Sequence, residues 1–219
     1  MIFKQLPAAV LWDMDGTLID SEPYWMKSEG AFAKANNGNW TEQDGLSLVG
    51  MSLYDSSKII KEKVGSDLEP EQIIEQLTDE VAAQLKQEIL WRPGAKELLE
   101  LLRKKKVKTA LVTMSMHRMA KQVADSIGFD AFDVIVAGDD VMHGKPHPEA
   151  YLKAAELLGV KPEDCVAFED SISGLRSAEA AGTKAVGIKN IVEIPAQPGR
   201  ILWSTLEGVT LSDLRRLFK

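Results

Sequence analysis

The sequence predicts an α/β fold with a Rossmann-like parallel sheet as its core and an all-helical segment inserted after the first strand. Two observations lead to this prediction. From residue 91 onward, helical and strand patterns alternate, which is typical of parallel strands joined by crossover helices. Residues 20–90, by contrast, carry helical periodicity without a convincing strand. We therefore expect a core of residues 1–19 and 91–219 and a helical insertion of residues 20–90.

The first strand is predicted at the apolar run Ala8–Trp12, which Pro7 precedes. Asp13 and Asp15 follow this run directly, before Gly16. Two carboxylates at the end of a buried strand repel each other and are costly to desolvate unless a cation neutralises them. The pair therefore indicates either a functional site or an ordinary Asp-rich turn, and the rest of the chain decides between the two.

The inserted segment contains three helical patterns, which glycines separate. The helices are predicted at Tyr24–Asn37, Leu53–Val64 and Pro70–Leu90. Thr41, Ser52 and Glu69 are residues that favour helix starts. Asp20–Pro23 and Leu90–Gly94 are the expected connections between the insertion and the core.

The second part of the core is predicted to contain four helix–strand pairs and a last short strand and helix. The helices are expected at Ala95–Lys105, Arg118–Ile127, Pro148–Leu158 and Gly174–Ala181. The strands that follow them are expected at Val107–Val112, Val134–Val136, Cys165–Phe168 and Ala185–Ile188. An apolar run at Ile201–Trp203 and a helix from Leu211 complete the pattern.

Composition excludes several classes of partner. The net charge is −7, and residues 20–90 account for the excess with 14 acidic and 6 basic side chains. No basic stripe is present to neutralise phosphates, so we expect no nucleic-acid partner. No apolar run approaches the roughly 20 residues that cross a bilayer, so we expect no membrane partner. The oligomeric state cannot be read from the sequence.

The single cysteine bears on location. Cys165 can form no internal disulfide, and it lies in an apolar stretch as a small core residue would. The amino-terminal residues lack the apolar segment and cleavage site of a signal peptide. We therefore expect the protein to be cytoplasmic.

Polar residues follow four of the predicted strands. In open α/β sheets, ligands bind beyond the carboxyl ends of the strands, so these residues are expected at one edge. Each alone has an ordinary explanation, such as capping a helix, but their convergence by chance is improbable. They are Asp13 and Asp15, then Thr113 and Ser115, then Asp139, Asp140 and Lys145, then Glu169 and Asp170.

Together these motifs resemble those of the haloacid dehalogenase-like hydrolase superfamily, and the resemblance covers essentially the whole chain. It is strongest to the capped phosphatase and β-phosphoglucomutase-like subgroup, in which the insertion is a helical cap. The family's motifs are Asp-x-Asp-Gly-Thr, a hydroxyl residue, a lysine before a proline, and an acidic pair. They stand here at Asp13–Thr17, Thr113, Lys145 and Glu169-Asp170.

The resemblance implies a role for each of these residues. Asp13 would attack phosphorus and form an aspartyl phosphate, and Asp15 would act as general acid and base. Thr113 and Lys145 would hold the phosphoryl oxygens. The implied cofactor is Mg2+, which prefers oxygen ligands. Its expected ligands are the Asp13 carboxylate, the Asp15 carbonyl and Asp170, with Glu169 nearby.

Ser115 and the three histidines of the chain are further candidates for the site. Ser115 and His117 follow Thr113 and are candidate substrate contacts, although a helix cap and a surface histidine are equally good interpretations. His143 and His147 flank Lys145, but the prolines that follow Lys145 and His147 spread this loop, so we expect no zinc-like cluster there.

The implied activity is a Mg2+-dependent phosphatase acting on a small phosphate monoester. A β-phosphoglucomutase-like mutase is the first alternative, but that pattern has an arginine where this chain has Leu53 and a histidine where it has Trp25. A neutral side chain cannot pair with the distal phosphate of a bisphosphate. A catalytically silent phospho-ligand binder is the second alternative. Hexose, deoxysugar, polyol and nucleotide phosphates all stay open as substrates.

Overall fold

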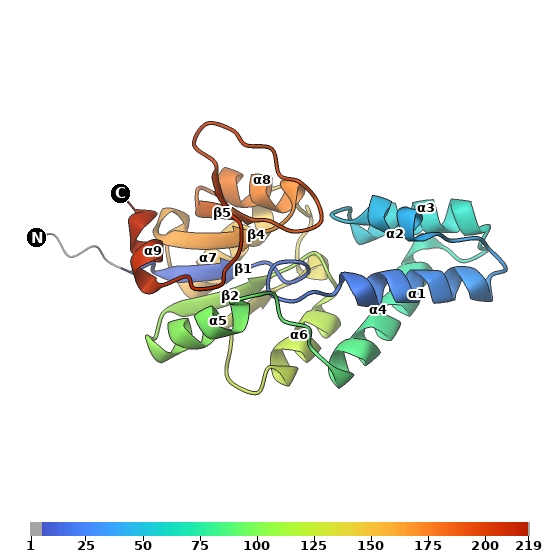
Figure 1. Ribbon diagram of the computed structural model, residues 1–219, viewed down its shortest axis with the longest axis horizontal. Helices are drawn as coiled ribbons and strands as arrows, with labels where there is room; N and C mark the ends of the chain where they lie inside the picture. Colours follow the sequence, from blue (N-terminus) through green and yellow to red (C-terminus); the bar gives the residue numbers. More distant parts are fainter. Residues whose placement is uncertain (1–5, 219) are drawn as a thin grey trace, which may run out of the picture.

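The computed structural model describes residues 6–218 and confirms the α/β fold (Figure 1). Within these residues, six parallel strands form one sheet in the order β3-β2-β1-β4-β5-β6. The strands are β1 (Ala9–Trp12), β2 (Lys108–Val112), β3 (Val134–Val136), β4 (Cys165–Glu169), β5 (Lys184–Ile188) and β6 (Ile201–Trp203). From β1 the chain builds the sheet outward on one side through β2 and β3, and then on the other side through β4, β5 and β6. Ligands of open α/β sheets bind at such a switch point.

Helices cover both faces of the sheet, which explains why its central strands are apolar on both sides. Side chains of α5, α6 and α9 pack with Val10 and Trp12, whereas those of α7 and α8 pack with Ala9 and Leu11. All four of these strand residues are fully buried. The helices are α5 (Ala95–Lys104), α6 (His117–Ser126), α7 (Glu149–Leu158), α8 (Ile172–Ala180) and α9 (Leu211–Arg216). Two short 3-10 turns are η1 (Gly138–Asp140) and η2 (Pro162–Asp164).

The inserted segment forms a group of helices beyond the carboxyl edge of the sheet, on the right of Figure 1. It comprises α1 (Glu22–Ala35), α2 (Glu42–Leu48), α3 (Leu53–Val64) and α4 (Pro70–Gln87). Helix α4 packs against α1 and α3 and also contacts α6 of the core. Arg118 of α6 donates to Glu75 and Asp79 of α4, at 2.6 Å and 2.8 Å. The division into domains at residues 20 and 90 stays a prediction.

Most of the predicted element bounds differ from the structure by one or two residues, as in α1, which spans Glu22–Ala35 instead of Tyr24–Asn37. Three of the differences follow from particular hydrogen bonds. Helix α2 lies between the first two predicted helices, where no helix was expected, and Thr41 caps it through a reciprocal pair of hydrogen bonds with Asp44. Helix α4 ends at Gln87 instead of Leu90, because the Leu90 carbonyl accepts from the backbone N–H of Asp20 at 2.6 Å. Helix α8 begins at Ile172, because Ser171 rather than a later residue caps it.

The two connections between the insertion and the core run side by side. Ile19 and Trp91 form an antiparallel bridge, and the N–H of Arg92 donates to the Leu18 carbonyl at 3.1 Å. These pairings anchor both ends of the inserted segment next to the end of β1 and the residues that follow it.

The single cysteine is a core residue, as its apolar surroundings in the sequence predict. Cys165 is fully buried in β4, and its thiol donates to the Lys161 carbonyl at 3.3 Å. Burial raises the pKa of this thiol to about 12, so it has no thiolate character near neutral pH. Among residues 6–218, no helix is both long and apolar enough to cross a membrane.

Candidate active site

A buried lysine joins the ends of three strands. Lys145 Nζ donates to Asp13 Oδ1 at 2.7 Å, to Glu169 Oε1 at 2.6 Å and to the Val112 carbonyl at 2.9 Å. The three side chains are at most 9% exposed. Burial would lower the pKa of Lys145, but the two carboxylates outweigh it and raise the pKa, so the lysine is charged.

Three buried carboxylates surround this single cation. Oxygen atoms of Asp13, Glu169 and Asp170 lie within 4.8 Å of one another. Burial, together with the charge of Glu169, raises the pKa of Asp13 well above its ordinary value, although Lys145 opposes the shift. Burial likewise raises the pKa of Asp170 to about 6. The cluster therefore has more negative charge than its lysine neutralises, and hard oxygen donors of this kind suit Mg2+.

Neighbouring groups orient the carboxylates of this cluster. Asp170 accepts from Thr17 Oγ1 at 3.1 Å and from Asn190 Nδ2 at 2.7 Å. Glu169 accepts from the Tyr151 hydroxyl at 2.5 Å. Both side chains are thus held in one orientation before any ligand arrives, which lowers the cost of ordering them on binding.

Asp15 has a separate set of partners, although it lies only two residues from Asp13. Its Oδ1 accepts from Ser21 Oγ at 2.5 Å and from Trp25 Nε1 at 3.3 Å. Its Oδ2 accepts from Ser115 Oγ at 2.7 Å and from Thr113 Oγ1 at 3.2 Å. None of these donors carries a charge. The two aspartates therefore occupy different electrostatic environments.

The turn after β1 requires glycine. Gly16 has φ of +79°, a conformation that side chains with a Cβ rarely adopt. A Cβ on Gly16 would also lie 2.1 Å from Asp170 Oδ2 and 2.6 Å from Asn190 Nδ2. The backbone therefore comes close to Asp170 in a way that only glycine permits, which explains the glycine after the second aspartate.

A cavity of about 590 Å3 opens over these residues, between the sheet edge and the inserted helices. Asp13, Asp15, Lys145 and Asp170 line its floor. Helices α1, α3 and α4 and the α2–α3 loop supply most of the opposite wall, which is largely apolar. The wall includes Trp25, Leu48, Met51, Leu53, Ile60 and Leu77.

The structure brings together most of the residues that the sequence predicted, but not His117. Thr113 and Ser115 line the cavity with the acidic residues and Lys145, and Glu169 lies behind Lys145. His117 is the first residue of α6, and its Nδ1 lies 2.6 Å from Asp140 Oδ2. It does not line the cavity. The acidic residues Asp139 and Asp140 hold His117 instead of joining the site.

The sequence interpretation missed two acidic residues of α1. Glu22 and Glu29 line the cavity on the same helix face as Trp25, a spacing of three and four residues that is visible in the sequence. Burial raises the pKa of Glu22 to about 8 and that of Glu29 to about 7. Neither Glu29 Oε2 nor the nearby Trp40 Nε1 makes a hydrogen bond within the described residues. The indole of Trp40 nevertheless lies close enough to Glu29 to offset part of the rise in its pKa.

Comparison with known proteins gives one family and consistent relatives. The family model for haloacid dehalogenase-like hydrolases matches residues 7–182. The chain is 33% identical over 179 residues to a phosphorylated carbohydrates phosphatase of Thermotoga maritima, covering 81% of this chain and 83% of that protein. It is 31% identical over 191 residues to hexitol phosphatase A of Escherichia coli, covering 84% of each. The crystal structure of CbbY from Rhodobacter sphaeroides in complex with phosphate superposes on this chain with a TM-score of 0.81 at 25% sequence identity. The match covers 93% of this chain and 96% of the CbbY chain.

We expect Gly16→Ala to weaken Mg2+ binding at least about tenfold, because the added methyl group displaces Asp170. Calorimetric titration of the metal-free protein measures this. The matched control is Gly128→Ala, since Gly128 also has positive φ, of +88°, but no atom within 4 Å of the added Cβ. Both variants should lose about 1–2 kcal/mol of stability from the strained backbone. Equal Mg2+ affinity in the two would contradict a metal site at Asp170.

We expect Glu29→Gln to become more stable than the parent as pH rises. The pKa of Glu29 is higher in the folded state than its ordinary value of 4.5, so the folded state keeps the proton more tightly. The parent therefore loses stability as pH rises from about 4.5 through 7, whereas glutamine does not titrate. Urea unfolding of metal-free protein at pH 5 and pH 8.5 should show a difference that grows by about 2 kcal/mol. The exposed Glu62→Gln serves as the control and should show no such growth.

Proposed function

The chain belongs to the haloacid dehalogenase-like hydrolase family, and from its site we propose that it is a Mg2+-dependent phosphatase. It hydrolyses a small, sugar-phosphate-like monoester through an aspartyl-phosphate intermediate. The observation that carries the proposal is the division between the two aspartates. Asp13 lies buried beside Lys145, and Asp15 is held by four uncharged donors at the cavity. This division supports a different role for each aspartate, with Asp13 reacting with phosphorus and Asp15 transferring a proton.

In the proposed first step, a carboxylate oxygen of Asp13 attacks phosphorus and the ester P–O bond breaks. Asp15 gives its proton to the departing alcohol oxygen. In the second step, water attacks the phosphorus of the aspartyl phosphate while Asp15 removes the proton of that water. Inorganic phosphate leaves and Asp13 is regenerated. The hydrogen bonds from Ser21 and Trp25 to Oδ1 hold the Asp15 carboxyl group in one place for both proton transfers.

Lys145, Thr113 and Ser115 are proposed to act on the phosphoryl group. Lys145 reduces the repulsion between Asp13 and the anionic substrate, because its charge lies 2.7 Å from the attacking carboxylate. Thr113 and Ser115 line the cavity and would turn their hydroxyls from Asp15 to the phosphoryl oxygens when substrate binds. The substrate role given to His117 is not part of the proposal, since His117 pairs with Asp140 outside the cavity.

The residues present fit Mg2+. Asp13, Asp170 and the Asp15 carbonyl would hold the ion, with Glu169 behind them, because three buried carboxyl groups share one lysine and burial disfavours their charged forms until a further cation is present. When bound, Mg2+ supplies positive charge to the phosphoryl oxygens and to the attacking carboxylate. We also propose a cytoplasmic location, as the single, buried cysteine suggests.

The charges of the cavity favour a phosphatase over a mutase. Lys145 is the one cationic side chain among the described residues that line it. The wall opposite contributes Glu22, Glu29 and Asp55, and Leu53 lines it at the position where the mutase pattern has arginine. A second phosphate group would meet carboxylates there instead of a cation. We propose that the alcohol part of the substrate is an uncharged sugar or polyol, as the names of the phosphatase relatives suggest.

We expect Asp13→Asn to lower hydrolysis of a generic aryl phosphate at least about 10^3-fold, because an amide cannot act as the nucleophile. Parent activity should disappear on adding a chelator and return with Mg2+. Asp125→Asn, on the exposed face of α6, is the control and should keep full activity. Substantial activity in Asp13→Asn would exclude Asp13 as nucleophile. Absence of hydrolysis of every ester by the parent would favour the silent binding module.

We expect monophosphates of hexoses and hexitols to exceed the matching bisphosphates in kcat/KM by at least about tenfold. The reason is that the cavity wall offers a second phosphate carboxylates and no cation. Leu53→Arg should raise kcat/KM for the bisphosphates and so reduce the ratio between the two substrate classes. Tyr54→Arg adds the same charge one residue later, at an exposed side chain outside the cavity, and should not. A parent enzyme that prefers bisphosphates would contradict the proposed substrate class.

A further inference from the structure

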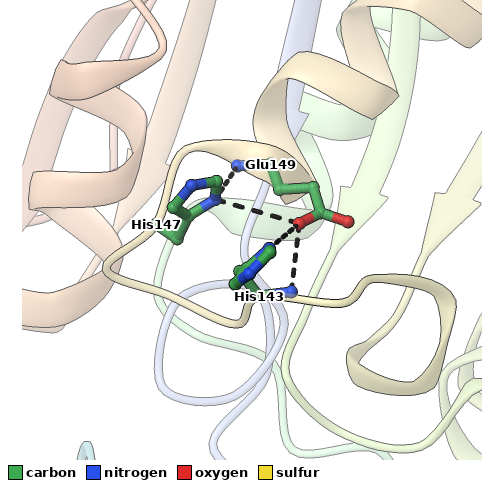
Figure 2. Close-up of side chains that lie close together, drawn as sticks. All are labelled: His143, His147 and Glu149. Atoms are coloured by element: carbon green, nitrogen blue, oxygen red, sulfur yellow. Dashed lines mark hydrogen bonds and ion pairs between the residues drawn. The ribbon is translucent and has the colours of Figure 1, made fainter.

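We propose that His143, His147 and Glu149 form a second metal site, which binds a divalent transition-metal ion such as Zn2+. One ligand atom from each of these side chains lies within 4.8 Å of the others (Figure 2). His143 Nδ1 lies 2.8 Å from Glu149 Oε2, and His147 Nδ1 lies 3.9 Å from the same oxygen. The sequence had indicated no such cluster, since the intervening prolines were expected to spread the loop, but the loop folds back onto the start of α7.

The cluster is organised around the Glu149 carboxylate, which is fixed by the backbone. Glu149 Oε1 accepts from the Met142 N–H at 2.8 Å, and Oε2 accepts from the His143 N–H at 3.0 Å. The two imidazole rings lie with centroids 4.7 Å apart and tilted by 38°. The loop is held from outside by the Ser177 hydroxyl, which donates to the His147 carbonyl at 2.6 Å. Figure 2 shows dashed lines from both rings to the same carboxylate oxygen and a further one from the Glu149 backbone N–H, which donates to His147 Nδ1 at 3.3 Å and which an ion would displace there.

The donor chemistry differs from that of the acidic cluster at Asp13. Two imidazoles and one carboxylate match the ligands of Zn2+, whereas Mg2+ prefers oxygen ligands alone. An ion would take the place of the proton between His143 Nδ1 and Glu149 Oε2, and the neutral imidazole would then carry its proton on Nε2. The His143 and His147 side chains are 63% and 52% exposed, so water can complete the coordination.

The position of the cluster gives the ion a consequence for the proposed active site. His143 and His147 stand two residues before and two residues after Lys145, whose ammonium group points away into the acidic cluster. An ion held by both histidines would tie together the two sides of the segment that carries Lys145. Occupancy of this site would thus restrain the loop that supplies the buried lysine.

Equilibrium dialysis of the intact protein with Zn2+ tests the proposal. Mg2+ is kept at about 10 mM to compete for oxygen ligands, and pH at about 8, because metal ligation needs neutral imidazoles. We expect one bound Zn2+ per chain whose affinity falls at least about tenfold in His143→Ala and in His147→Ala. The matched control is His117→Ala, which removes a half-exposed histidine paired with Asp140 outside the cluster and should leave Zn2+ affinity unchanged. Glu149→Gln should weaken binding as well.

Two outcomes would overturn the proposal. The first is the absence of Zn2+ binding by the parent in the presence of Mg2+. The second is Zn2+ binding that persists in both histidine variants but is lost in Asp13→Asn, which would place the ion in the acidic cluster. Co2+ provides an independent measurement, because its absorption spectrum changes with nitrogen ligation. That change should be present in the parent and absent in His143→Ala. Thermal unfolding without metal verifies that each variant is folded.

Discussion

The buried contact between Lys145, Asp13 and Glu169 is the interaction on which the rest of the site depends. Lys145 extends from the β3–α7 connection to the ends of β1, β2 and β4, where its ammonium group donates all three of its hydrogen bonds. Removing one partner of a buried charge pair leaves the other charge uncompensated, so the loss of any one of these residues would destabilise the others. One lysine cannot neutralise three buried carboxylates, however. This excess of acidic groups over cations is the physical basis for the divalent cation proposed at this edge of the sheet.

The short turn after β1 directs two neighbouring carboxylates, Asp13 and Asp15, to different sets of partners. Asp13 continues the direction of the strand into the buried charge cluster, whereas Asp15 is turned toward hydroxyl and indole donors from α1 and the β2–α6 loop. Gly16 makes this possible, because its positive φ and its lack of a Cβ let the backbone pass close to Asp170. The proposed nucleophile and the proposed proton-transfer group thus lie within three residues of each other.

The inserted helices determine what can stand above the phosphate group. They contribute an apolar wall with a few carboxylates, which is the basis for the proposed preference for an uncharged alcohol over a second anion. Their attachment is local: two paired connections at Ile19–Trp91 and an ion-paired contact between α4 and α6. Chemistry and selectivity therefore come from different parts of the chain, the first from the sheet edge and the second from the insertion.

The sequence by itself determined that helices and strands alternate to form a parallel sheet. It also determined the proposed catalytic residues at the ends of the strands. Strand and helix periodicity report which faces are buried, and the charged residues directly after β1 and β4 must lie at the sheet edge. Tertiary structure alone decided which side chains meet across loops. His117 turned to Asp140, Glu29 entered the cavity wall, and His143 and His147 came together at Glu149. The physical reason is that strand ends are positioned by the hydrogen-bonded sheet, whereas a loop or a helix face finds its partners only once the whole chain has packed.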